Sequence, residues 1–134
     1  MKQFTFPKSE HLCHRSDIER LFAAPSKSAA VYPLRAVGRV VAFTPESKKA
    51  RVQVLMSVSK RKLRHAVERN RAKRQLREAF RIRKHLIIDA LPEGKGLHLA
   101  FLWLSDKPED SSRIHKSMER LLLNMSEALS ATGE

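Results

Sequence analysis

Cysteine is nearly absent from this chain of 134 residues. Cys13 has no partner for an internal disulfide, and its neighbours lack the spacing of zinc ligands, so we expect a small buried or half-buried side chain. No apolar run reaches the length of about 18 residues that a membrane span needs. The N-terminus has no signal-peptide pattern. These absences favour a cytoplasmic protein that has no membrane partner.

Motifs for protein-based catalysis are missing as well. The sequence has six His residues, but it has no His-x-x-x-His pair, no cluster of acidic residues and no nucleophile motif. The carboxylates that could serve a metal or acid–base site are scattered along the chain: Asp17, Asp89, Asp106 and Asp110. We therefore predict no catalytic residue and no protein-bound metal, and a protein-only nuclease is not indicated.

Acidic residues are few, because 14 Asp and Glu face 27 Lys and Arg, which gives a formal net charge of +13. Twelve of the 25 residues from Lys60 to Lys84 are Lys or Arg, and only Glu68 and Glu78 are acidic. On a helix that begins near Ala66, the basic side chains sweep one continuous arc. That arc holds Arg69, Asn70, Lys73, Arg74, Arg77, Arg81 and Lys84, and the opposite arc holds Ala72, Leu76, Ala79, Phe80, Leu86 and Ile87.

Such a helix can bury its apolar side in a core and offer its basic side to a polyanion. Ordinary solvated faces mix both signs of charge at i,i+4 spacing, which this face does not. A membrane-active helix is disfavoured because its apolar face has no Trp and is needed for the core. A helix-turn-helix DNA-binding motif would need a helix just before the basic one, but residues 51–59 alternate like a strand. The partner indicated is nucleic acid.

The length fits one RNA-binding domain spanning residues 1–134. Hydrophobic periodicity predicts an amphipathic helix from Ser9 to Phe22 and a closing helix with an apolar stripe from Ile114 to Leu129. Strands are predicted at residues 31–43, 51–59 and 97–104, with a hairpin connection at residues 44–48. The predicted order is α-β-β-α-β-α, with helices packed on a small mixed sheet.

One motif narrows the function. Ser57-Val58-Ser59-Lys60 is followed after a short gap by Ala66-Val67-Glu68-Arg69-Asn70-Arg71 and then Ala72-Lys73-Arg74-Gln75-Leu76-Arg77. This pattern resembles the signature of the bacterial ribonuclease P protein component, in which a strand ending in Ser and Lys leads into a helix carrying Arg-Asn-Arg. The N-terminal Asp17-Ile18-Glu19-Arg20-Leu21-Phe22, the strand near Tyr32-Pro33-Leu34-Arg35 and the closing helix follow the family's order. The resemblance covers nearly the whole chain.

The resemblance implies an α+β fold, a two-layer sandwich with about four strands in a mixed sheet and a left-handed β-α-β crossover. Pattern alone favours a right-handed crossover, which is the rule in about 98% of cases. In the family an RNA subunit is the catalyst, and it removes the 5′ leader of precursor tRNA with Mg²⁺ that the RNA mainly binds. The protein is a binding and activating subunit whose partners are the catalytic RNA and the leader, and no DNA partner is implied.

Two binding surfaces follow from the resemblance. The basic helix would hold the catalytic RNA through Arg69, Asn70, Arg71, Lys73, Arg74 and Arg77, since guanidinium groups fork onto phosphate oxygens. A cleft between the sheet and the N-terminal helix would hold the single-stranded leader through Phe22, Tyr32, Arg35, Ser57, Ser59 and Lys60, by stacking and backbone contacts. From the pattern alone, Phe22 would be a core residue.

The sequence departs from the family pattern in three places. A glycine common before Ala66 is missing near Arg64, His11 stands where arginine is usual, and Ile18 replaces a usual aromatic. These departures weaken the expected leader contacts more than the expected contacts with the catalytic RNA. The alternative is a non-catalytic RNA-binding protein of the ribosomal or RNA-chaperone type, which would have no leader-dependent effect on cleavage.

Overall fold

The computed structural model describes residues 10–12, 14–25, 27–44, 46 and 50–132. Cys13, Ser9 and most of the predicted connection at residues 44–48 lie outside this part of the chain. The elements in chain order are α1 (Arg15–Ala23), β1 (Lys27–Val31), β2 (Leu34–Ala42), β3 (Val52–Ser57), α2 (Ala66–Arg83), α3 (His85–Ile88), β4 (Lys95–Trp103) and α4 (Ser111–Thr132). The fold is α+β, as predicted, but the order is α-β-β-β-α-α-β-α.

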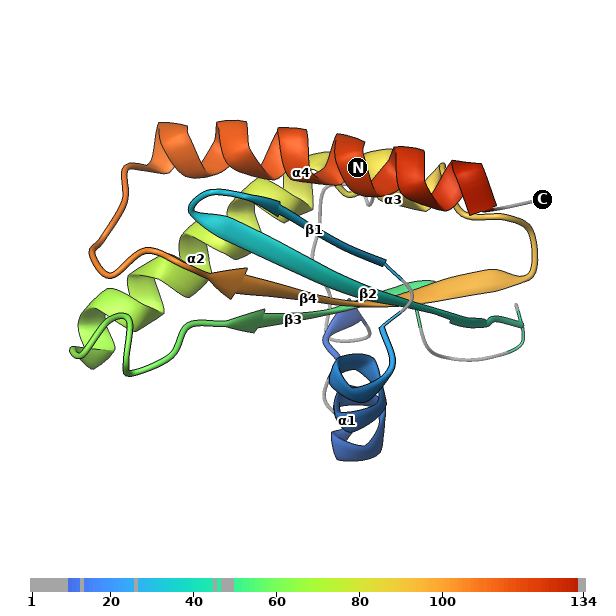
Figure 1. Ribbon diagram of the computed structural model, residues 1–134, viewed down its shortest axis with the longest axis horizontal. Helices are drawn as coiled ribbons and strands as arrows, with labels where there is room; N and C mark the ends of the chain where they lie inside the picture. The colour runs from blue at the N-terminus through green and yellow to red at the C-terminus, as the bar shows by residue number, and fades with distance from the viewer. Residues whose placement is uncertain (1–9, 13, 26, 45, 47–49, 133–134) are drawn as a thin grey trace.

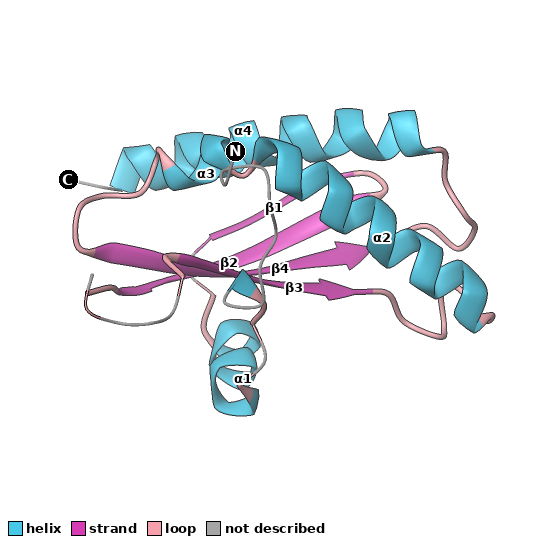
Figure 2. Ribbon diagram, turned by 180° about the vertical axis from the view of Figure 1, so that it is seen from behind, coloured by secondary structure: helices cyan, strands magenta, loops and turns pink. Residues whose placement is uncertain are grey.

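The four strands form one mixed sheet in the order β1-β2-β4-β3. β2 is antiparallel to both β1 and β4, and β3 is parallel to β4. Figure 2 shows α2 in front of the sheet, with β4 above β3 and both strands pointing to the right. When the strands are turned to point upward, β4 lies to the left of β3. The β3-α2-β4 crossover is therefore left-handed, against the general rule.

The strand predicted at residues 31–43 forms as β2, and a further strand that was not predicted, β1, precedes it. Val31 pairs with Leu34, so Tyr32 and Pro33 form a two-residue turn between β1 and β2. β1 was missed because its sequence, Lys-Ser-Ala-Ala-Val, has little of the β-branched and aromatic content that marks strands.

The predicted hairpin between residues 31–43 and 51–59 is wrong. β4 lies between β2 and β3, and all nine residues of β2 pair with β4. A hairpin prediction assumes that strands adjacent in sequence are also adjacent in the sheet. Here β4 lies between β2 and β3, so β2 and β3 do not pair with each other.

Two layers of helix cover the two faces of the sheet. Figure 1 shows α2, α3 and α4 on one face and α1 on the other. The larger core lies under α2 and α4 and includes Leu34, Leu99, Phe101 and Met118. A smaller cluster under α1 contains Leu12, Leu21, Val37 and Ala100. Alternate residues of each strand therefore enter different cores, as the pleat requires.

The basic helix forms where it was predicted, from Ala66 to Arg83. Its buried stripe is Ala72, Gln75, Leu76, Ala79 and Phe80, which packs on the sheet and on α4. The one polar member of the stripe is satisfied, because the Gln75 side-chain amide donates to Glu109 O and to Ser111 Oγ, each at 2.9 Å. This contact ties the middle of α2 to the start of α4.

The N-terminal helix begins later than predicted, at Arg15. Residues 11–12 instead run beside β3: His11 forms an isolated parallel bridge with Val54, and Leu12 N donates to Val54 O at 2.9 Å. Leu12 is still buried, but its burial comes from strand-like pairing and not from a helical stripe.

Candidate RNA-binding surfaces

The outer face of α2 presents a group of exposed polar and cationic side chains. Asn70, Arg71 and Arg74 are exposed, whereas Lys73 and Arg77 are half-buried. These predicted RNA contacts come from a single rigid helix, which fixes their spacing. Arg81, on the same arc, hydrogen-bonds to Glu78. That hydrogen bond is the main cause of the lowered pKa of Glu78, so this carboxylate stays ionised and offsets part of the charge of the basic face.

Arg69 has a different environment from Arg71 and Arg74. Its Nη1 donates to Leu63 O at 2.9 Å and to Arg64 O at 2.8 Å. The side chain is half-buried, and it closes the loop that leads into α2. Arg69 therefore holds this loop in place, in addition to any contact that it makes with RNA.

The same loop is the segment in which the family's usual glycine is missing. Its turn is built from Ser59, whose carbonyl oxygen accepts from Lys62 N at 3.2 Å and Leu63 N at 3.1 Å, with Leu63 buried beneath it. Among the described residues, no non-glycine residue has a positive φ. The loop therefore forms without the left-handed conformation for which glycine is preferred.

Lys73 and Arg77 lie beside β3, at the edge where residues 11–12 pair with Val54. Together with His11 and Leu12 they line a shallow pocket of about 190 Å³ against Val54, Leu55 and Met56. His11 stands in this groove, where its imidazole adds to the polar lining beside the two cations. The basic face of α2 is therefore continuous with the N-terminal segment.

Lys84, which the sequence placed on the basic arc, is not available to a polyanion. Its Nζ lies 2.8 Å from Glu10 Oε2 and 3.0 Å from Glu10 Oε1, and the side chains are only 6% and 13% exposed. Lys84 keeps helical backbone angles at the end of α2, so its burial comes from the contact with Glu10 of the N-terminal segment, which the helical rotation alone does not reveal. This pair fastens the N-terminal segment to the end of α2.

Several predicted leader contacts lie on the α1 face of the sheet. Arg35 of β2 and Ser57 of β3 both stand opposite Leu102 of β4, so the three residues form one row across the sheet. Two strand spacings separate Arg35 from Ser57, which is about 10 Å. Arg35 is held by a hydrogen bond from Nη2 to Ser28 Oγ at 2.9 Å. Lys60 is exposed just beyond the end of β3.

Phe22 is 45% exposed on α1 and is not a core residue. Leu21 fills the core position of this helix, and Ile18 packs partly against the same cluster. Ile18 therefore serves packing at the position where the family commonly has an aromatic residue. The structure leaves Phe22 open to solvent, as a stacking role requires, but that role remains a prediction.

Tyr32 and Ser59 lie apart from this row. The Tyr32 ring is 54% exposed and contacts α4, where Arg113 Cζ lies 5.3 Å from the ring centroid. Because α4 covers the face opposite to α1, the structure does not bring Tyr32 together with Phe22 (Figure 1). Ser59 is exposed, but its Oγ accepts from Lys62 N at 3.3 Å within the loop. Arg113 was not predicted, because its contact with Tyr32 joins residues that lie 81 positions apart in sequence.

No metal or membrane site is found in the described part of the chain. Among the residues that the structure describes, no three His, Cys, Asp or Glu side chains gather in a way that could hold a metal ion. None of the helices described is both long and apolar enough to cross a membrane.

Comparison with known proteins gives a consistent result. The family model described as Ribonuclease P matches residues 6–126. The ribonuclease P protein component of Porphyromonas gingivalis strain ATCC 33277 is 38% identical over 123 residues, covering 91% of this chain and 87% of that protein. The Chlorobaculum tepidum protein of the same name is 33% identical over 128 residues, covering 89% and 81%.

A solved structure of the Staphylococcus aureus RNase P protein has the same fold, with a TM-score of 0.66 at 22% identity, covering 88% of this chain and 96% of that one. The family-model match, the sequence identities and the shared fold all indicate the same family. The chain belongs to the ribonuclease P protein component family.

Proposed function

We propose that this chain is the protein subunit of a ribonuclease P holoenzyme and promotes removal of the 5′ leader from precursor tRNA. Family membership supports the role in tRNA 5′ processing and the partnership with a ribonuclease P RNA. The hydrolysis itself belongs to the RNA subunit with Mg²⁺, and the protein contributes binding. The proposed compartment is the cytoplasm, and the proposed partners include neither DNA nor membrane.

The observation that carries this proposal is the exposed basic face of α2 within a fold of this family. Arg71, Arg74 and Asn70 project from the face, and among the described residues no intramolecular hydrogen bond or ion pair engages their side chains. Unengaged guanidinium groups on a rigid helix can each meet a phosphate without first breaking an internal contact. This face is the proposed site for the catalytic RNA, with Lys73 and Arg77 at its border.

The leader is proposed to lie on the α1 face of the sheet. Phe22 supplies an exposed ring for stacking, and Arg35, Ser57 and Lys60 supply polar contacts to the sugar-phosphate backbone. These groups recognise single-stranded RNA without requiring a particular sequence, as a subunit that serves many precursor tRNAs needs. Tyr32, which stacks with Arg113 beside α4, is left outside this cleft.

A matched pair of variants tests the leader site. Phe22→Ala and Leu123→Ala each remove one large apolar side chain, and the two side chains are almost equally exposed, at 45% and 44%. Since stacking of a base on an aromatic ring is worth about 1–3 kcal/mol, Phe22→Ala should weaken holoenzyme binding of leader-bearing precursor tRNA about tenfold. Leu123→Ala on α4 should leave it unchanged. Equal affinities for the two variants would refute the stacking role.

A further inference from the structure

A second binding feature lies on the side of α1 that faces away from Phe22. A pocket of about 520 Å³ is formed there by α1, the end of β2, and the adjoining residues of β3 and β4. Its volume falls within the range of about 300–1,000 Å³ that small-molecule sites occupy. None of the residues lining it belongs to the predicted leader or catalytic-RNA contacts.

The pocket and the proposed leader cleft lie on opposite sides of α1. Arg20 lines the pocket, and Phe22 stands two residues later, about 160° away around the helix. On the sheet, Arg39, His98 and Gln53 form a row across β2, β4 and β3. This row is four residues along β2 from the row of Arg35, a distance of about 13 Å. Leu21 of α1 fills the small core between the two rows.

The floor and wall of the pocket suit an unpaired base. Gln53 and His98 lie at the floor and are only 6% and 9% exposed, so their amide and imidazole groups are presented in a largely dehydrated setting. Phe43, half-buried, supplies an apolar wall. Amide and imidazole groups can hydrogen-bond to base edges, and an aromatic side chain can stack on the face of a base.

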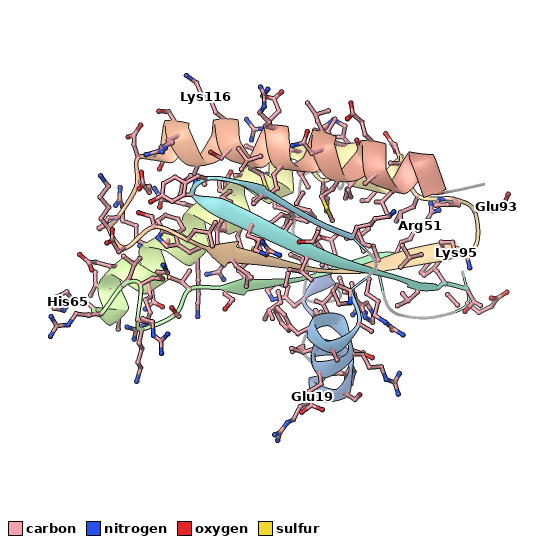
Figure 3. The ribbon with its side chains drawn as sticks, viewed as in Figure 1. Glu19, Arg51, His65, Glu93, Lys95 and Lys116 are labelled. Carbon is pink, nitrogen blue, oxygen red and sulfur yellow. The ribbon has the colours of Figure 1, made fainter. Side chains whose placement is uncertain are left out.

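The charges at the pocket suit an anionic phosphodiester. The hydrogen-bond donors of Arg51 are used within the fold, because its guanidinium donates to Lys95 O at 2.8 Å and to the carbonyl oxygens of Leu91 and Pro92 at 3.1 and 2.6 Å. Figure 3 shows Arg51 and Lys95 together at the end of the molecule opposite His65. Arg20 and Arg39 make no side-chain hydrogen bond or ion pair within the described ranges.

The carboxylate of Asp17 also lines the pocket, so together with Arg20, Arg39 and Arg51 the lining side chains carry a formal net charge of +2. A phosphodiester group carries a single negative charge, which this positive lining attracts.

We propose that this pocket binds one unpaired nucleotide of RNA, with the base on Gln53, His98 and Phe43 and the phosphodiester on Arg20 and Arg39. The proposal rests on the proposed function, because it adds a second single-strand contact to a ribonuclease P subunit. The nucleotide can come from the upstream part of the leader or from the catalytic RNA, and both sources present the same chemistry.

The first test uses the full-length protein and small probes. Diuridylate and diadenylate each carry one phosphodiester, and dimethyl phosphate serves as the anion without a base. Titration followed by ¹H–¹⁵N NMR should shift the backbone amide signals of Gln53 and His98 with the dinucleotides and not with dimethyl phosphate. Arg39→Gln should weaken this binding about tenfold, as loss of a charge-assisted hydrogen bond predicts. Arg120→Gln, an exposed change on α4, is the control and should have no effect.

Equal shifts with dimethyl phosphate would show an anion site only and overturn the nucleotide assignment, as would no shift with any probe. The holoenzyme then separates the two sources. A loss in Arg39→Gln that is confined to precursor tRNA with a long leader assigns the leader, and weaker binding of the RNA subunit assigns the catalytic RNA. If Arg39→Gln causes neither of these losses, the proposal is overturned. Failure of the wild-type protein to bind the RNA subunit would instead count against the proposed function, whatever the dinucleotides do.

Discussion

The exposed face of α2 makes a quantitative prediction for the double variant Arg71→Gln/Arg74→Gln. Both side chains are exposed and neither closes a loop or joins an ion pair among the described residues, so the folded chain should lose little stability. A charge-assisted hydrogen bond contributes about 1.5–3 kcal/mol, which is roughly tenfold or more in affinity for each arginine. The residues are three positions apart and therefore neighbours on the helix, so their effects can overlap. We expect a loss of about 10- to 100-fold in affinity for the cognate ribonuclease P RNA.

Salt dependence distinguishes phosphate contact from other losses. Each neutralised phosphate contributes about 0.7–0.9 to the slope of log affinity against log salt. Removing two contacts should therefore reduce the slope by about 1.5. The assay is a filter-binding or fluorescence titration of the RNA subunit at four salt concentrations, with urea unfolding as the check on folding.

Lys116→Gln/Arg120→Gln is the matched control, because it removes two exposed cations from α4. Figure 3 shows Lys116 projecting from α4, away from the sheet. An unchanged slope for the α2 double variant, or an equal reduction for the α4 control, would refute the assignment of the RNA surface to α2. Arg69→Gln differs from both, because it also breaks the two carbonyl contacts that hold the loop. It should lower the unfolding free energy by about 1–2 kcal/mol.

Three further predictions concern the fold around these surfaces. Lys84→Met leaves Glu10 without its partner in a site where the Glu10 side chain is only 13% exposed. The unfolding free energy measured in urea should therefore fall by about 3 kcal/mol. A loss below about 0.5 kcal/mol would contradict the buried pair. Burial, and then the charge of Arg83, lowers the pKa of His115 below 6.5. The unfolded chain therefore binds a proton that the folded chain does not, and stability should fall as the pH drops below 6.5. This fall should be less steep in His115→Gln. Parallel pH profiles for the two proteins would contradict this. Gly96→Ala would place a Cβ 2.7 Å from a backbone oxygen and should unfold the protein at a lower temperature than Gly94→Ala, whose Cβ meets nothing within 4 Å and costs only the strain of φ 80°.

Local pattern was sufficient to predict the elements with strong periodicity. α2 begins at Ala66 and buries Ala72, Leu76, Ala79 and Phe80 because an apolar stripe at 3.6-residue spacing can be read directly from sequence. The closing helix was predicted for the same reason.

Non-local pairing could not be predicted in this way. The insertion of β4 between β2 and β3 depends on contacts between residues more than forty positions apart, such as Leu34 with Trp103 and Val52 with Leu97. The handedness of the crossover came from the family resemblance, since the physical rule favours the opposite hand. β1 lacked a compositional signal, and its pairing follows from the turn at Tyr32 and Pro33.

For the candidate surfaces too, local pattern was sufficient for some features, whereas others depend on contacts between residues far apart in sequence. Charge density indicated the proposed RNA face, because twelve basic residues in one segment are visible without a structure. It did not separate Arg71, which is exposed, from Lys84, which is buried against Glu10, since that distinction depends on a partner 74 positions away. Phe22 could not be assigned from its helix pattern alone, because only the packing of Leu21 and Ile18 shows which side of α1 meets the sheet.

The central claim is that this protein assists an RNA catalyst by binding the leader of its substrate. The most direct measurement is cleavage of precursor tRNA by the cognate RNA subunit at low Mg²⁺, with and without the protein, alongside binding of long-leader and leaderless ligands. We expect the protein to restore cleavage and to tighten binding of the leader-bearing ligand only. A protein that binds the RNA but neither restores cleavage nor distinguishes the two ligands would contradict the account and indicate a general RNA-binding protein.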